Sequence, residues 1–234
     1  MKRDIFKVLG FSFCIFIIHI NNLSCEEKYE TKLDEILQYI EDASERLKTM
    51  TADIQYTRNI SLLDSVETSH GTLKYKKPKK MKIHFLPPRN EVNVFDGAHM
   101  WIYHPEEQQV EKYKIDDGIN APQEVDLFEL GYEYSADKIR KKYDITIIDD
   151  LTNLAGTIYH LELIPKETTE SQYSRILLWI KETEWLPSQF QLFESDGEIV
   201  NTIALSNINI NGEISDNIFR LDLPDSVEII EPFK

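Results

Sequence analysis

The stretch from Gly71 to Val110 constrains what this chain can fold into more than any other segment. Its apolar residues alternate with charged ones in several consecutive runs. The breaks between these runs fall at Pro78, Pro87-Pro88, Asp96-Gly97 and Pro105. Alternation with a period of two places the apolar side chains on one face of a strand, and proline and Asp-Gly pairs end strands or form turns. The stretch therefore predicts consecutive antiparallel strands with one apolar and one polar face.

The same alternation occurs on both sides of this stretch. It is present at Ala52–Arg58 and resumes at Tyr143–Ile148, Thr157–Ile164, Arg175–Glu182, Leu186–Phe193 and Ile199–Ile208. Asp196-Gly197 and Asn211-Gly212 are further turn pairs of the hairpin type. The chain as a whole therefore predicts about ten strands, most of them antiparallel.

Two segments have a helical period instead. From Thr31 to Lys48 the apolar residues recur every three or four positions, which predicts an amphipathic helix with Thr31 as its N-cap. The segment Val125–Lys142 predicts one or two short helices. Because a sheet must cover its apolar face, two arrangements are open. The helices form a lid over the mouth of a strongly curved sheet with an apolar cavity, or the chain is an ordinary α+β domain with a filled core.

The first residues have the pattern of a secretory signal peptide. A charged head precedes an apolar run, Val8–Ile20, of about 13 residues, which is too short to span a bilayer. The sequence thus predicts a signal peptide over residues 1–24 and a single domain over residues 25–234. Cys25 is the only cysteine of that domain, and its position after the apolar run makes it a candidate for lipidation.

Composition and motifs exclude several classes of function. A formal net charge of −15 opposes binding to nucleic acid. The chain has no nucleophile elbow, zinc-protease motif, Cys-x-x-Cys pair or phosphate-binding glycine loop. His160 and Glu162 share a strand face, but two such residues do not make a metal site, and surface pairing explains them more simply. We therefore expect no enzyme, no cofactor and no metal.

The opening stretch also resembles the LolA family, the periplasmic carriers of outer-membrane lipoproteins. The resemblance is carried by the order and spacing of short elements, and it extends over nearly the whole chain after the signal peptide. These elements are Met50–Thr57, Gly71–Leu73, Lys77-Pro78, Met81–Phe85, Pro88, Val94–Gly97, Trp101–Tyr103, Pro105 and Phe219–Pro224. The resemblance implies a mainly β, α+β fold: a strongly curved antiparallel half-barrel of about eleven strands, with a helical lid over an apolar cavity.

The resemblance also implies a site and partners. The cavity would receive the acyl chains of lipoproteins, delivered by an inner-membrane lipoprotein-releasing ABC transporter complex and passed to an outer-membrane acceptor, and the carrier would be a periplasmic monomer. The lipid-binding residues would be Ile36, Ile40, Leu47, Ile54, Tyr56, Leu73, Tyr75, Met81, Ile83, Phe85, Trp101 and Phe128. For Met81, Ile83 and Phe85 the alternative is ordinary core packing.

One position departs from the family. The residue before the family's proline is usually an arginine that holds the lid shut, and here it is Lys77. An ammonium offers three donors on a flexible stem instead of a rigid fork of five, so a Lys77 lid contact should be weaker. Lys77 also belongs to a basic cluster that could meet anionic headgroups or form a solvated outer face. The cluster comprises Lys74, Lys76, Lys77, Lys79, Lys80 and Lys82.

Two related functions remain as alternatives. A membrane-anchored acceptor resembling LolB would carry an acylated Cys25. A regulator resembling RseB would use a similar half-barrel to sense lipids or lipoproteins.

Overall fold

The computed structural model describes residues 29–115, 130, 132–154, 156–167, 169 and 171–232. The chain divides into two compact units, residues 1–39 and 40–234, which are described separately. Helical backbone covers residues 29–46, so residues 29–39 belong to the first unit and the end of the helix to the second. The predicted signal peptide, Cys25 and Phe128 lie outside the described residues.

The described residues of the second unit are built on one sheet of twelve strands. Its order is β12-β6-β5-β4-β3-β2-β1-β11-β10-β9-β8-β7, and the ladders are antiparallel except for the parallel pair of β12 and β6. The strands are β1 (Thr49–Ile60), β2 (Ser65–Lys76), β3 (Lys80–Phe85), β4 (Glu91–Phe95), β5 (His99–His104), β6 (Gln109–Lys114), β7 (Tyr143–Asn153), β8 (Gly156–Pro165), β9 (Tyr173–Lys181), β10 (Leu186–Glu194), β11 (Ile199–Ile210) and β12 (Glu228–Ile230).

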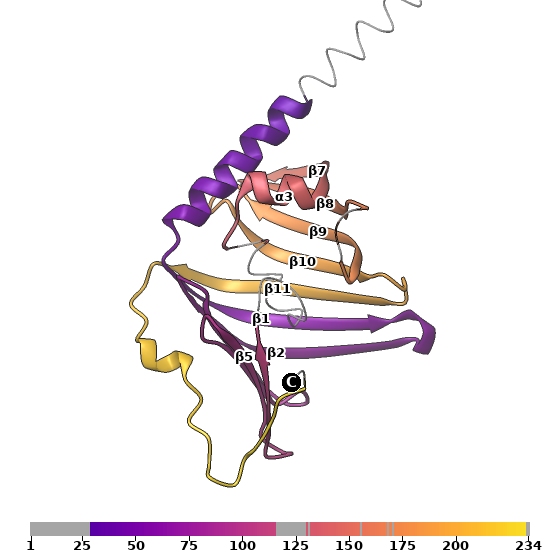
Figure 1. The fold of residues 1–234 in the computed structure, drawn as a ribbon. Coiled ribbons are helices and arrows are strands. Elements are labelled where there is room, and N and C mark those ends of the chain that lie inside the picture. The colour runs from indigo at the N-terminus through magenta and orange to yellow at the C-terminus, as the bar shows by residue number, and fades with distance from the viewer. Residues whose placement is uncertain are drawn as a thin grey trace, which may run out of the picture. The chain divides into compact units, whose positions relative to one another are not determined.

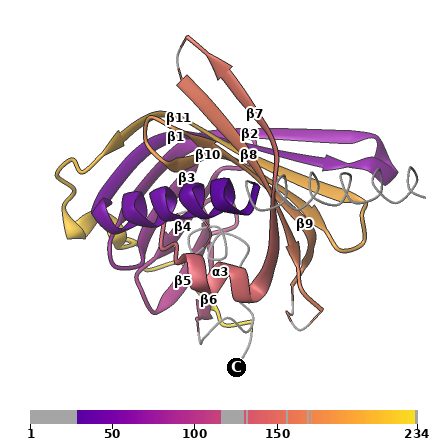
Figure 2. The same cartoon turned by 90° about the horizontal axis from the view of Figure 1, so that it is seen from above.

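The sheet consists of two meanders that meet at one ladder. Strands β1 to β6 follow one another in space, as do β7 to β11, and β1 pairs with β11 to join them. Figure 1 shows the strong curvature of this sheet, and Figure 2 shows it from above. The predicted mainly β half-barrel is thus confirmed, with twelve strands in the described part of the chain where about eleven were expected.

Alternation divides the sheet into an apolar inner face and a polar outer face. In the first meander, one inner row runs across five strands and is almost fully buried: Met50, Tyr75, Met81, Phe95 and Met100. In the second, the corresponding row is Leu161, Leu178, Phe190 and Ile203. These two rows are the centre of the core.

Short helical elements accompany the sheet. Helix α3 (Ala136–Lys142) precedes β7 and buries Ile139; Asp137 lies in its first turn and Arg140, Lys141 and Lys142 in its last, a distribution that favours the helix dipole. A 3₁₀ turn, η1 (Ser61–Leu63), connects β1 to β2, and η2 (Asp216–Phe219) follows β11. Within the described residues, none of the helices combines the length and hydropathy that a transmembrane span requires.

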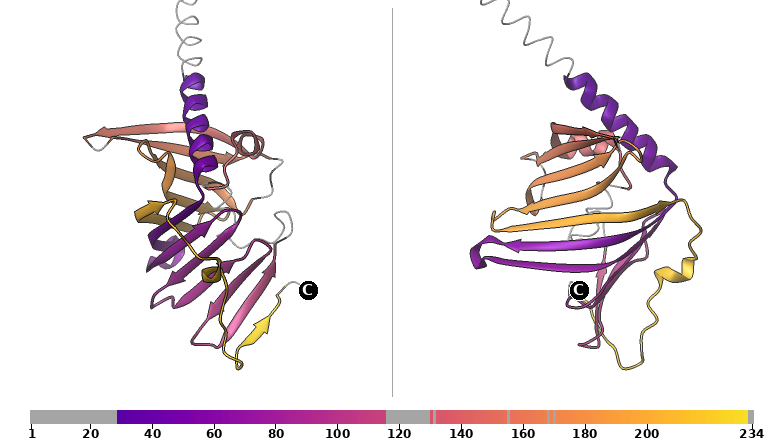
Figure 3. Two further views of the ribbon diagram at one scale, coloured as in Figure 1. Left: turned by 90° about the vertical axis from the view of Figure 1, so that its left-hand side faces the viewer. Right: turned by 180° about the vertical axis from the view of Figure 1, so that it is seen from behind.

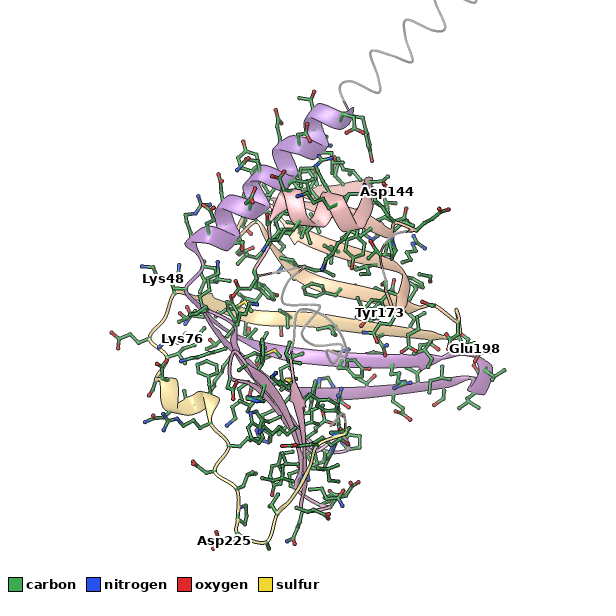
Figure 4. The ribbon with its side chains drawn as sticks, viewed as in Figure 1. Lys48, Lys76, Asp144, Tyr173, Glu198 and Asp225 are labelled. Atoms are coloured by element: carbon green, nitrogen blue, oxygen red, sulfur yellow. The ribbon has the colours of Figure 1, made fainter. Side chains whose placement is uncertain are left out.

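The segment after β11 forms a strap, defined here as residues 211–227. It leaves the end of β11, passes η2, and reaches the edge of the first meander, where β12 pairs with β6 (Figure 3). The ammonium of Lys76 holds the strap through the Asp216 carboxylate at 2.7 Å and the Ile214 carbonyl at 2.8 Å, and Figure 4 shows Lys76 beside η2. The strap thus covers part of the outer face.

Gly71 lies where β2 and β3 leave no room for a side chain. It pairs with Phe85 of β3, and a Cβ at this position would lie 2.2 Å from the backbone oxygen of His84. No side chain fits in that space, which gives a physical reason for the glycine at the start of the stretch that first indicated the fold.

Candidate functional site

The inner face of β1, β2 and β3 brings most of the predicted lipid-binding residues together. Tyr75 lies opposite Met81, Leu73 opposite Ile83, and Gly71 opposite Phe85. Ile54 and the half-buried Tyr56 extend this wall on β1. Apart from Tyr56, all of these side chains are at most 4% exposed. The structure therefore shows a continuous apolar wall that is closed to water in this state.

Trp101 does not belong to this wall. In the β4–β5 ladder Met100 pairs with Phe95 and Trp101 with Val94, so Met100 lies on the inner face and Trp101 on the outer one. The Trp101 indole donates to the Asp96 carboxylate at 3.0 Å, and the Lys112 ammonium lies 4.9 Å from its ring centre. The expectation that Trp101 lines the cavity is wrong. Both faces of β5 carry apolar residues, so the sequence alone could not assign them, and the observed register places Met100 on the inner face.

The predicted helical residues fall in different parts of the chain. Ile40 and Leu47 are both 1% exposed within the second unit. Ile36 belongs to the first unit. Phe128 lies outside the described residues, as does Cys25.

Ser44, near the end of the helix, is the centre of a polar clasp, defined here as Ser44, Lys77, Tyr132, Glu133 and Tyr134. The Lys77 ammonium donates to the Ser44 carbonyl at 2.5 Å. The Ser44 hydroxyl donates to the Tyr132 carbonyl at 2.9 Å and accepts from the Tyr134 amide at 3.1 Å. The clasp therefore ties the β2–β3 turn and the segment before α3 to the end of the helix.

Glu133 connects the clasp to the apolar wall. Its carboxylate accepts from the Tyr75 hydroxyl at 2.7 Å and from the Lys79 amide at 3.1 Å. Burial, followed by the hydrogen bond and charge of Glu133, raises the pKa of Tyr75 well above its ordinary value. Tyr75 is thus a permanent donor that holds Glu133 against β2.

Tyr132 bridges the two meanders across the inner face. Its ring lies 5.9 Å from that of Tyr75 on β2 and 6.2 Å from that of Phe190 on β10. Its hydroxyl donates to the Pro187 carbonyl at 3.0 Å, and burial raises its pKa. One aromatic side chain from the segment before α3 therefore covers apolar wall on both sides of the β1–β11 ladder.

The far end of the inner face, toward the β1–β2 turn, is polar. Tyr56 donates to Asn201 at 2.7 Å, and Asn201 donates to Glu194 at 3.0 Å. The Arg89 guanidinium lies over the rings of Phe85 and Tyr56, 4.2 and 4.7 Å from their centres, and pairs with Glu91 at 2.9 Å. A groove of about 720 Å³ opens here, lined by residues that include Arg58, Ser69 and Arg89. The lining of the inner face thus changes from apolar to polar side chains along the strands.

The histidine and acid considered for metal binding are paired with other residues. His160 lies 3.3 Å from Asp149 and stacks on Trp179, while Glu162 pairs with Arg175 at 2.5 Å. Among the described residues no group of three or more histidine, cysteine or acidic side chains is placed to hold a metal ion.

Sequence reasoning missed Ser44, Tyr132 and Glu133. One signal was available for Ser44, because it is the polar residue four positions after Ile40 on the apolar stripe of the helix. A polar side chain at such a position must find partners when it is buried, and Ser44 is 1% exposed.

A single curved sheet whose inner face is apolar, closed by a small number of polar contacts, defines a class of binding proteins. The family model described as "Outer membrane lipoprotein carrier protein LolA" matches residues 45–222, and the chain belongs to this family.

Among its relatives, an outer-membrane lipoprotein carrier protein of Nitrosospira multiformis is 24% identical over 95% of this chain and 98% of its own. An uncharacterized protein of Methanocaldococcus jannaschii is 24% identical over 84% of this chain, which spans about half of that protein (53%).

Solved structures support the fold. An uncharacterized conserved protein of Thermus thermophilus has a TM-score of 0.54 at 12% identity, covering 86% of this chain and 99% of its own. MucB has a TM-score of 0.50 at 12% identity, covering 82% of this chain and 63% of its own.

Proposed function

We propose that this protein carries lipoproteins across the periplasm from the inner to the outer membrane, holding their acyl chains against the inner face of the sheet. The observation that carries this proposal is the closure of the apolar wall by the polar clasp. Hydrogen bonds such as that of Lys77 to Ser44 can break and re-form, so a wall closed in this way can open. Membership of the LolA family supports the same function.

The closed wall accounts for how a carrier can release its cargo. Burying one methylene contributes about 0.8 kcal/mol, so three fully buried acyl chains would exceed roughly 30 kcal/mol, well beyond the limit of non-covalent affinity. Here Tyr75 and Met81 are already fully buried by the protein's own packing, and the cargo must displace Tyr132 from Tyr75. The cost of exposing and reordering this packing offsets part of the gain and leaves the cargo releasable.

The wall residues have two roles in this proposal. Leu73, Tyr75, Met81, Ile83 and Phe85 are buried in the core while the wall is closed, and they become acyl-chain contacts when the lid opens. Methionine suits both roles because its flexible thioether adapts to irregular apolar surroundings. The two interpretations of Met81 given by the sequence then describe two states of one site.

The test is to purify the protein from the periplasm and examine it by native mass spectrometry. If the protein is a lipoprotein carrier, acylated lipoproteins should co-purify with it. The purified protein should also extract lipoprotein from inner-membrane vesicles supplied with the ABC transporter complex. A protein that is always empty and extracts nothing would refute the proposal. The mass of the mature N-terminus separates a soluble carrier from a LolB-like anchored acceptor, because acylation of Cys25 adds the mass of a diacylglyceryl group.

A further inference from the structure

The outer face of β2 and β3 carries a cationic groove that the proposed carrier function does not use. Its floor contains Lys74 and Lys82, which lie directly opposite each other in the ladder. Its volume is about 510 Å³, and the strap forms its other side. The lining residues are Thr72, Lys74, Lys82, His84, Ser215, Asn217, Ile218, Arg220 and Asp222.

The basic cluster of the sequence divides into two groups in the structure. Lys76 and Lys80 reach Asp216 of the strap at 2.7 and 3.4 Å, and Lys77 reaches Ser44. Lys79 belongs with them, because its backbone amide donates to Glu133 at 3.1 Å. These four lysines therefore connect separate segments of the fold.

Lys74 and Lys82 form the second group. Both side chains are half-buried, and within the described part of the chain neither ammonium group makes a hydrogen bond or an ion pair. Among the described residues that line the groove, Asp222 is the only acid, and its charge acts on Lys82 without a close contact.

Like charges placed directly opposite each other destabilise a sheet. At Lys82, burial and then the charge of Lys74 lower the pKa of the ammonium. Arg220 adds a third basic side chain to the groove. This concentration of positive charge occurs in a chain with a net charge of −15, so it is a local property of the groove.

We infer that this groove binds a phosphate group, either free in solution or in the headgroup of a lipid. Phosphate oxygens can accept charge-assisted hydrogen bonds from the two ammonium groups and from the Arg220 guanidinium. Thr72 and Ser215, which carry hydroxyl groups, line the same groove. A bound dianion would relieve the repulsion between Lys74 and Lys82. Because the groove lies on the opposite face from the apolar wall, the two sites can be occupied together.

Three variants test the site: Lys74→Met, Lys82→Met and, as a matched control, Lys141→Met on the exposed part of α3. Without phosphate, Lys82→Met should unfold at the same temperature as wild type or higher, because it removes one of two repelling charges. Inorganic phosphate should raise the unfolding temperature of wild type and of Lys141→Met, compared with chloride at the same ionic strength. Each groove variant should lose about tenfold in phosphate affinity, measured by titration calorimetry.

The source of the phosphate is separated by sedimentation with phosphatidylcholine vesicles that contain phosphatidic acid. A lipid headgroup is indicated if the protein binds these vesicles, if binding is lost in the Lys74 and Lys82 variants, and if inorganic phosphate displaces it. Stabilisation by inorganic phosphate without vesicle binding indicates free phosphate.

Two outcomes overturn the inference. One is that phosphate acts no differently from chloride, or acts equally on wild type and the groove variants. The other is that the groove binds poly-glutamate and neither form of phosphate, which would assign it to an acidic polypeptide.

Discussion

Lys77 connects the β2–β3 turn to the last turn of the helix with one ammonium group. The Ser44 carbonyl that accepts its hydrogen bond belongs to the end of the helix, where the dipole is negative, so a cation is favoured there. A flexible ammonium can make this contact, although it lacks the planar fork of the arginine that the family usually has at this position. The contact is therefore suited to opening and closing.

Replacing Lys77 by methionine should open the clasp. Loss of the charged hydrogen bond should speed hydrogen exchange about tenfold at residues 40–46 and 132–134, because local opening becomes about 1.5 kcal/mol easier. Lys77→Arg should restore protection, and Lys141→Met should leave it unchanged. Equal protection in Lys77→Met and wild type, together with equal retention of cargo, would remove Lys77 from the proposed lid mechanism.

Gly71 is constrained by contact and not by its backbone dihedrals. Gly71→Ala would force β2 and β3 apart, since the new Cβ meets the His84 carbonyl oxygen at 2.2 Å. We expect a loss of about 2–3 kcal/mol in the free energy of unfolding, measured by denaturant titration. Gly212→Ala is the control, because its nearest neighbour would be the Asn209 side chain at 3.5 Å, an ordinary contact. If both variants lose the same stability, the close approach at Gly71 is not the cause.

At this scale the period-two pattern predicted some residues and could not predict others. Met81, Ile83 and Phe85 alternate with charged residues, so their shared face follows from the sequence. Met100 and Trp101 are neighbours and both apolar, and only the register of the β4–β5 hairpin assigns each to a face. Ser44 and Tyr132 are 88 positions apart, and no periodicity relates them.

Among the elements, the strap is the one whose path the sequence did not show. Residues 211–227 contain no long alternating run, and β12 is a three-residue strand that pairs in parallel with β6. Its position depends on contacts such as that of Asp216 with Lys76 and Lys80. Those are contacts between distant segments, whereas the helix and the long strands follow from local periodicity.

The attachment of the strap should depend on pH through Asp216. Hydrogen bonds from Lys76 and then Lys80 lower the pKa of this carboxyl below its ordinary value. Its stabilising contribution is therefore fully present above the unfolded pKa, about 4, and is lost as the pH falls through the lower folded value.

Asp216→Asn should accordingly increase hydrogen exchange in the strap at pH 7. The difference from wild type should shrink as the pH falls below about 4, where the wild-type carboxyl also loses its charge. Asp225→Asn, an exposed position on the same strap (Figure 4), is the control and should exchange as wild type does. If the strap of Asp216→Asn exchanges hydrogen as slowly as that of wild type at every pH, other contacts hold the strap in place.

For the second unit as a whole, cargo and clasp should compete. A lipopeptide with three acyl chains should raise hydrogen exchange at residues 132–134, because its chains replace Tyr132 against the wall, while the ladders of β2 with β3 keep their protection. The same peptide without acyl chains should have no effect. Binding of the lipopeptide with unchanged exchange at these residues would place the cargo elsewhere.

The ladder between β1 and β11 has a consequence for how the chain reaches this structure. Tyr56 and Asn201, hydrogen-bonded across it, are 145 positions apart. Each meander can assemble from neighbouring hairpins, but the seam between them needs closure of a very long loop, which slows folding. We therefore expect refolding to show two fast hairpin-rich halves followed by a slow joining step, during which β1 and β11 present unpaired edges to any other chain nearby.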